Sequence, residues 1–119
     1  MRKLIWLWLL CAWAGASAAD ELVSLQVRDG QSVAYWWMPN PSATATVLLF
    51  SGGSGGIGYR DGQPQSNNFL IRSRELFRKQ GFQVALMGNP SDKRQMDDAW
   101  RTSAEHRQDV QAVLADLQQ

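Results

Sequence analysis

The residues best suited to chemistry form a glycine-rich segment, residues 51–58, which reads Ser-Gly-Gly-Ser-Gly-Gly-Ile-Gly. It follows directly on an apolar run, residues 47–50. Glycine has no Cβ, so backbone N–H groups in such a segment can come close to a ligand or a reacting atom. A buried strand that leads into a glycine-rich loop is typical of binding sites in α/β proteins. We therefore take this glycine loop as the candidate site.

One motif in the glycine loop is the dinucleotide fingerprint G-x-G-x-x-G, which Gly53, Gly55 and Gly58 match. That fingerprint requires a helix that opens at once, so that the helix N-terminus meets the pyrophosphate. Here a polar stretch that includes Asp61-Gly62 and Pro64 follows instead. The context therefore disfavours a dinucleotide, and we expect no cofactor.

A second motif is the nucleophile elbow G-x-S-x-G, which Gly52, Ser54 and Gly56 match. The elbow needs an acid and a histidine later in the chain. The only histidine, His106, lies in a predicted helix, where we expect a solvated or helix-packing side chain. A serine hydroxyl without a base is a poor nucleophile, which argues against Ser54 as a catalytic residue.

The elements that must position the loop are predicted from periodicity. Residues 22–38 alternate apolar and polar on both sides of Asp29-Gly30, which predicts an antiparallel hairpin. Residues 46–50 and 82–87 do not alternate and are apolar except at Thr46 and Gln83, as strands covered on both faces are. Between them, residues 69–80 have helical spacing and Gly81 supplies a left-handed stop. This strand, helix, strand unit predicts parallel pairing with a right-handed crossover.

The last predicted element is a helix that begins at Thr102, where Thr102 and Glu105 fit a capping box. Apolar residues at helical spacing follow on one side only. Such a one-sided helix is expected to cover a sheet. The stripe consists of Val110, Val113, Leu114 and Leu117.

A third interpretation of the glycine loop comes from a resemblance. Residues 47–58, 68–74 and 101–107 resemble the N-terminal portion of secreted bacterial α/β-hydrolases, and the likeness extends over residues 22–119. It implies an α/β fold with a partial α/β-hydrolase-like sheet, in which an antiparallel N-terminal hairpin is followed by parallel strands with crossover helices. Residues 20–119 would then be the N-terminal part of such a domain.

The resemblance also implies roles for the loop. The backbone N–H groups of Gly53 and Ser54 would form the oxyanion hole, while Gly52, Gly55 and Gly56 complete a glycine loop that lets the substrate approach. One such donor contributes about 3 kcal/mol to transition-state stabilisation. Ser51 departs from the family, because many esterases and lipases carry a histidine at this position.

The family's fifth strand, nucleophile elbow, acid and histidine do not follow before Gln119. We therefore expect an N-terminal fragment of an exported serine hydrolase that carries the oxyanion-hole loop, lacks the catalytic triad and is inactive alone. Completed, it would act on a small-molecule ester- or amide-type substrate. The alternative is a non-catalytic periplasmic binding or interaction module that uses the glycine loop as an anion or peptide cradle. The resemblance further implies that residues 47–50 form an open apolar strand edge.

The N-terminus reads as a cleaved signal peptide over residues 1–19, with a basic start, an apolar stretch and small residues before the cleavage site. The chain is therefore expected to be secreted or periplasmic, without a stable membrane anchor after cleavage. Cleavage would remove Cys11, the only cysteine, and leave 10 basic against 11 acidic residues. That balance gives no reason to expect nucleic acid as a partner. With one histidine and no mature cysteine, no metal site is predicted.

Overall fold

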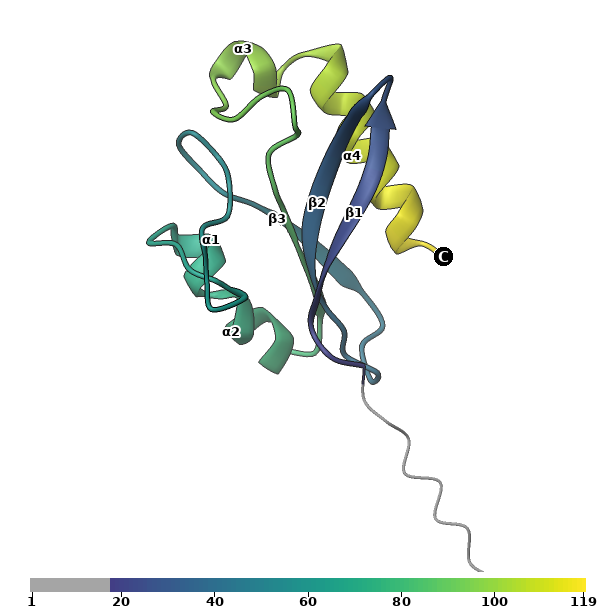
Figure 1. Ribbon diagram of the computed structural model, residues 1–119. Coiled ribbons are helices and arrows are strands. Elements are labelled where there is room, and N and C mark those ends of the chain that lie inside the picture. The colour runs from purple at the N-terminus through teal and green to yellow at the C-terminus, as the bar shows by residue number, and fades with distance from the viewer. Residues whose placement is uncertain (1–17) are drawn as a thin grey trace, which may run out of the picture.

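A computed structural model describes residues 18–119 (Figure 1). The predicted signal peptide, including Cys11, lies outside the described residues except for positions 18 and 19. The main sheet contains β1 (Glu21–Arg28), β2 (Gln31–Met38), β3 (Thr46–Phe50) and β6 (Gln83–Met87), in the order β1-β2-β6-β3. A separate two-stranded ribbon pairs β4 (Tyr59–Arg60) with β5 (Gln63–Pro64). The helices are α1 (Phe69–Arg72), α2 (Arg74–Lys79), α3 (Asp98–Arg101) and α4 (Ala104–Leu117).

The expected fold class is wrong. We expected a partial α/β-hydrolase-like sheet, with parallel strands and crossover helices after the hairpin. The structure is instead a small domain whose mixed four-stranded sheet is mostly antiparallel: β1 with β2 and β2 with β6 are antiparallel, and only β3 with β6 is parallel. The physical reason lies in β6, whose residues 84–87 are all buried and which takes a neighbour on each side. One neighbour belongs to the hairpin and runs in the opposite direction.

Several local predictions are confirmed. The hairpin turns at Asp29-Gly30, where Gly30 has a φ of 68°, and Val23 faces Tyr35 across the two strands. The crossover from β3 to β6 gives the expected parallel pair, with Leu48 opposite Ala85. The helical stretch of residues 69–80 is divided at Ser73, however, into α1 and α2.

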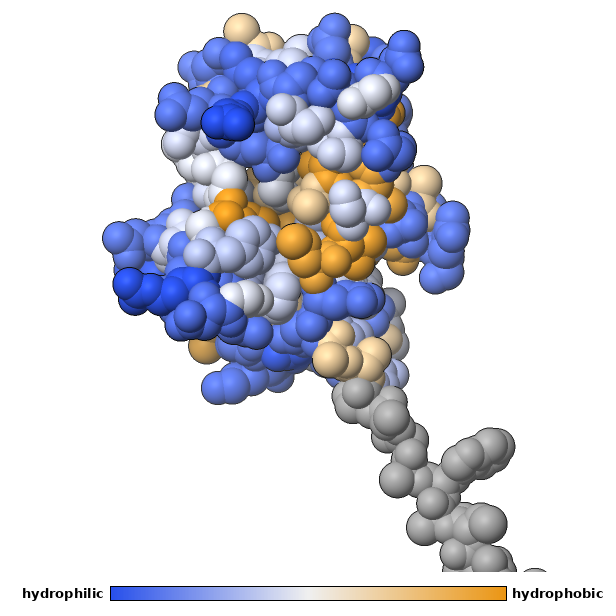
Figure 2. Space-filling model, in the orientation of Figure 1, coloured by the Kyte–Doolittle hydropathy of each residue, from blue (hydrophilic) through white to orange (hydrophobic). Residues whose placement is uncertain are grey.

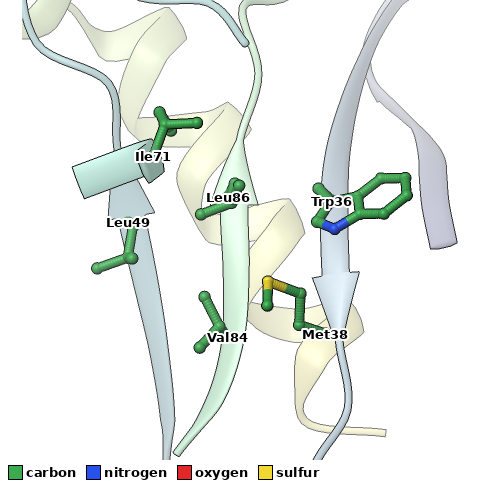
Figure 3. Close-up of a cluster of buried hydrophobic side chains, with 6 residues drawn as sticks. All are labelled: Trp36, Met38, Leu49, Ile71, Val84 and Leu86. Carbon is green, nitrogen blue, oxygen red and sulfur yellow. The ribbon is translucent and has the colours of Figure 1, made fainter. Parts of the chain in front are cut away.

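Two hydrophobic clusters cover the two faces of the sheet. Figure 1 shows α1 and α2 on one side of the strands and α4 on the other. On the first side, Ile71 of α1 packs with side chains from three strands, as Figure 3 shows. On the second side, α4 inserts Val113, which is fully buried. The first cluster comprises Trp36, Met38, Leu49, Ile71, Val84 and Leu86.

Polar contacts fix α4 on its face of the sheet. The guanidinium of Arg28 in β1 bonds Asp109 of α4, with 2.7 Å between Nε and Oδ1, and also Asp92 at 2.7 Å. The Tyr35 hydroxyl donates to Asp116 at 2.5 Å. Asp109 is wholly buried, so its charge needs the Arg28 partner. These bonds join β1 and β2 to α4, and β1 also to the segment after β6.

Candidate functional site

The glycine loop begins where β3 ends and requires glycine at several positions. Gly53, Gly55 and Gly56 have φ values of 61°, 75° and 82°. In this left-handed region a side chain is strained, so glycine is favoured. A tight turn closes the first half of the loop, because the N–H of Gly55 donates to the carbonyl of Gly52 at 3.1 Å.

Two side chains from outside the loop hold its carbonyl groups. Nη2 of Arg101 donates to the carbonyl oxygens of Ser51 and Gly53 at 3.2 and 2.6 Å. Nδ2 of Asn89 donates to the carbonyl of Ser54 at 3.1 Å, and the N–H of Met96 reaches the same oxygen at 2.7 Å. The carbonyls are therefore fixed by the protein itself.

Two N–H groups of the loop, those of Gly53 and Ser54, are not used in this way. Among the hydrogen bonds within residues 18–119, none is donated by the N–H of Gly53 or of Ser54. Both residues are exposed. Within residues 52–55, φ is positive at Gly53 and Gly55 and not at Gly52 or Ser54, so its sign alternates. Such alternation is the basis of backbone concavities that bind anions through successive N–H groups.

Asn89, in the segment after β6, fits closely against the loop. A Cβ at Gly55 would lie within 3 Å of Oδ1 of Asn89, and one at Gly56 would lie 3.5 Å from its Nδ2. Asn89 also donates to the carbonyl of Arg94 at 2.7 Å, so a single amide joins the loop to the chain that leads to α3. Gly55 is thus required both by its φ and by the position of Asn89.

The charge beside the loop is positive. Arg101 forms no ion pair with any carboxylate of the part of the chain that the structure describes. Its guanidinium donates to the carbonyls of Ser51 and Gly53. In a trans peptide the C=O and N–H point in opposite directions, so the Ser54 N–H points away from the guanidinium that holds the Gly53 carbonyl. The loop therefore has free backbone donors, and its positive neighbour lies on the carbonyl side.

The two competing motifs do not find their structural context. After the G-x-G-x-x-G match the chain forms the β4–β5 ribbon, and the next helix, α1, begins only at Phe69. The helix that a dinucleotide would need directly after the loop is therefore not there. For the G-x-S-x-G match, no hydrogen bond within the described residues joins Ser54 to His106.

His106 belongs to the core beneath the loop. Its side chain is 9% exposed, its ring meets Phe50 edge to face with centroids 6.0 Å apart, and its Nδ1 has no partner. Burial lowers the pKa of this imidazole, while the charge of Asp109 opposes and that of Arg101 adds to the effect. Of the two expectations for His106, a solvated or a packed side chain, the structure shows the packed one.

Arg101 and Asn89 are the residues that sequence reasoning did not identify as parts of the site. Asn89 follows a predicted strand, which is a position where functional residues gather in sheets of this kind. No pattern in the sequence marks Arg101, because its role depends on where α3 lies against the loop.

The described residues contain no cluster of histidine, cysteine, aspartate or glutamate suited to a metal ion. Within residues 18–119 no helix has the length and apolarity needed to cross a bilayer. Comparisons of the chain with protein-family models, with curated proteins and with solved structures find no match.

Proposed function

We propose that this chain supplies the oxyanion-binding part of an exported hydrolase that acts on esters or amides. The N–H groups of Gly53 and Ser54 would hold the negative charge that develops on the substrate's carbonyl oxygen. The observation that carries the proposal is that both N–H groups are free while the carbonyls of Ser51, Gly53 and Ser54 are held. Each preorganised donor of this kind contributes about 3 kcal/mol to stabilising the transition state.

The proposal depends on the loop and not on a fold family, because function resides in sites rather than in folds. The assignment to an exported protein draws on the sequence pattern of residues 1–19. The loop contributes binding only, and neither Ser54 nor His106 is assigned the part of nucleophile or base.

A titration with acetate tests the donors directly, because its carboxylate mimics the oxyanion. In ¹⁵N-labelled protein, acetate should shift the amide signals of Gly53 and Ser54 in a saturable way. We expect acetate to bind with a Kd of about 1 mM, because only a few charge-assisted hydrogen bonds hold it. Ser54→Pro removes one N–H and should abolish the response at Gly53. Ser54→Ala keeps that N–H and should leave the response unchanged.

Two outcomes would contradict this proposal. One is acetate binding that moves other amides but not those of Gly53 and Ser54. The other is stoichiometric labelling of Ser54 by a serine-directed phosphonate, which would make the hydroxyl a nucleophile rather than a bystander. Circular dichroism of both Ser54 variants checks that a lost response is not a lost fold.

A further inference from the structure

A groove of about 450 Å³ lies directly beside the glycine loop. It shares Gly56 with the loop and Asn89 with the loop's support. Its volume falls in the range of about 300–1,000 Å³ that small-molecule sites occupy. The groove therefore adjoins the end of the glycine loop that follows the free N–H groups of Gly53 and Ser54.

The walls of the groove are mainly apolar. Leu22, Ile57 and Tyr59 line it, and Leu22 and Tyr59 remain 51% and 43% exposed. In the view of Figure 2, hydrophobic residues gather in the middle of the molecule, between the hydrophilic surface over α3 and that over α1 and α2. Exposed apolar surface of this kind is typical of a binding groove.

The walls are firmly supported from below. Leu22 lies directly opposite Trp36 in the β1–β2 register, and the Tyr59 ring lies 6.0 Å from the Trp36 ring. Trp36 itself is 5% exposed and belongs to the hydrophobic cluster on this face. Trp36 of the sheet therefore supports two of the lining side chains, those of Leu22 and Tyr59.

The lining of the groove includes one position that requires glycine and one charged residue. Gly88 lines the groove, and a Cβ there would lie 2.6 Å from the carbonyl oxygen of Ala34, so bare backbone is required. Arg94 is the one charged side chain among the lining residues, and its guanidinium forms no hydrogen bond within the described residues. Asn89 donates to the carbonyls of both Arg94 and Ser54, which places the backbone of Arg94 beside the Ser54 carbonyl.

We infer that this groove binds the apolar acyl chain of the substrate, with the acyl carbonyl carbon at the glycine loop. The inference rests on the proposed function and adds a substrate class: esters or amides of aliphatic monocarboxylic acids longer than acetate. Apolar walls would hold the chain. Arg94 lines the groove, and Gly53 and Ser54 precede the lining residue Gly56 in the loop. A short acyl group would leave Leu22 and Tyr59 in water and gain nothing from them.

A series of straight-chain carboxylates, from acetate through butyrate and hexanoate to octanoate, tests this assignment on the purified protein. Affinity measured at the Gly53 and Ser54 amides should rise about fourfold for each methylene that enters the groove. Leu22→Ser should weaken octanoate binding roughly five- to tenfold and leave acetate binding unchanged. Leu76→Ser is the matched control, because Leu76 is also exposed but lies on α2 outside this groove, and it should change neither.

The outcomes separate the two proposals. If acetate shifts Gly53 and Ser54 but longer chains bind no better, or Leu22→Ser has no effect, the groove assignment is overturned and the oxyanion donors stand. If no carboxylate shifts those two amides, the proposed function fails, and the groove assignment with it, even where octanoate shifts Gly56 and Gly88.

Discussion

Gly55 shows how strongly single residues constrain the glycine loop. Its φ of 75° disfavours any side chain, and the space that a side chain would need is already occupied by Asn89. Gly53 has a similar φ of 61°, but a Cβ there would meet nothing within 4 Å. A side chain at Gly53 would therefore cause backbone strain only, whereas one at Gly55 would also clash with Asn89.

We predict that Gly55→Ala destabilises the protein more than Gly53→Ala does. The Gly53 variant should lose about 1–2 kcal/mol from backbone strain alone. The Gly55 variant should lose more, because Asn89 must also move and release the Ser54 carbonyl. Urea unfolding of both variants measures the difference, and equal losses would show that Asn89 does not confine the loop.

His106 makes stability depend on pH. Burial lowers the pKa of the folded state's imidazole below its ordinary value of 6.5. As pH falls through 6.5, the unfolded chain takes up a proton at His106 before the folded protein does, so the free energy of unfolding must fall. Above that pH the neutral ring carries no such penalty.

We therefore predict that the free energy of unfolding rises with pH between the folded-state pKa of His106 and about 6.5. His106→Phe removes the titrating group and should flatten this part of the profile. Asp92 and Asp97 have lowered pKa values, so they change the free energy of unfolding only below about pH 3.8 and do not mask the effect of His106. An unchanged slope in the His106→Phe variant would contradict the assignment.

At the scale of elements, α4 shows where sequence patterns mislead by one residue. The capping box predicted at Thr102 and Glu105 is wrong: Ser103 is the N-cap, and its Oγ accepts from the N–H of His106 at 3.1 Å. Thr102 is instead the C-cap of α3, and its hydroxyl donates to the carbonyl of Asp98 at 3.0 Å. Because α3 was not predicted, its end was mistaken for the start of α4.

Ser103→Ala should lower the free energy of unfolding by about 1 kcal/mol, since it leaves an N–H of the first helical turn without its acceptor. Thr102→Ala is the matched control and should cost less, because no helix N-terminus depends on its hydroxyl. Thermal or urea unfolding of the two variants decides between the caps. A larger loss in the Thr102 variant would restore the capping box at that residue.

For the whole molecule, the open side of the sheet governs behaviour in solution. In the described residues β3 pairs with β6 on one edge, and no strand pairs with its other edge. An unpaired apolar strand is a template for association with another chain. Hydrophobic side chains of α4 flank it, with Leu114 42% exposed.

We predict concentration-dependent self-association through this edge. Thr46→Lys places a charge on the exposed start of β3 and should reduce association, while changing the free energy of unfolding by no more than about 0.5 kcal/mol. Thr44→Lys adds the same charge at an exposed position before the strand and should have a smaller effect. Sedimentation over a range of concentrations measures both, and equal effects would indicate general charge repulsion.

The sequence predicted features that depend on neighbouring residues better than features that depend on contacts between distant segments. The hairpin follows from local periodicity, the strands predicted at residues 46–50 and 82–87 follow from apolar runs, and the glycine loop follows from composition. The position of β6 between β2 and β3 depends on contacts between distant segments, which local patterns do not encode. For the same reason the supports of the loop, Arg101 and Asn89, were not identified: each acts on residues at least 35 positions away.

The central position of β6 also sets an order of events during synthesis and folding. The β1–β2 hairpin is local and can form as soon as it emerges, but both β2 and β3 must wait for a strand that is made later. Until then the inner edge of the hairpin is unpaired, and Arg28 waits for Asp109, which lies 81 residues further on. A nascent chain that stops before β6 therefore has a hairpin and a third strand that share no backbone pairing. The face that α4 covers is completed later still.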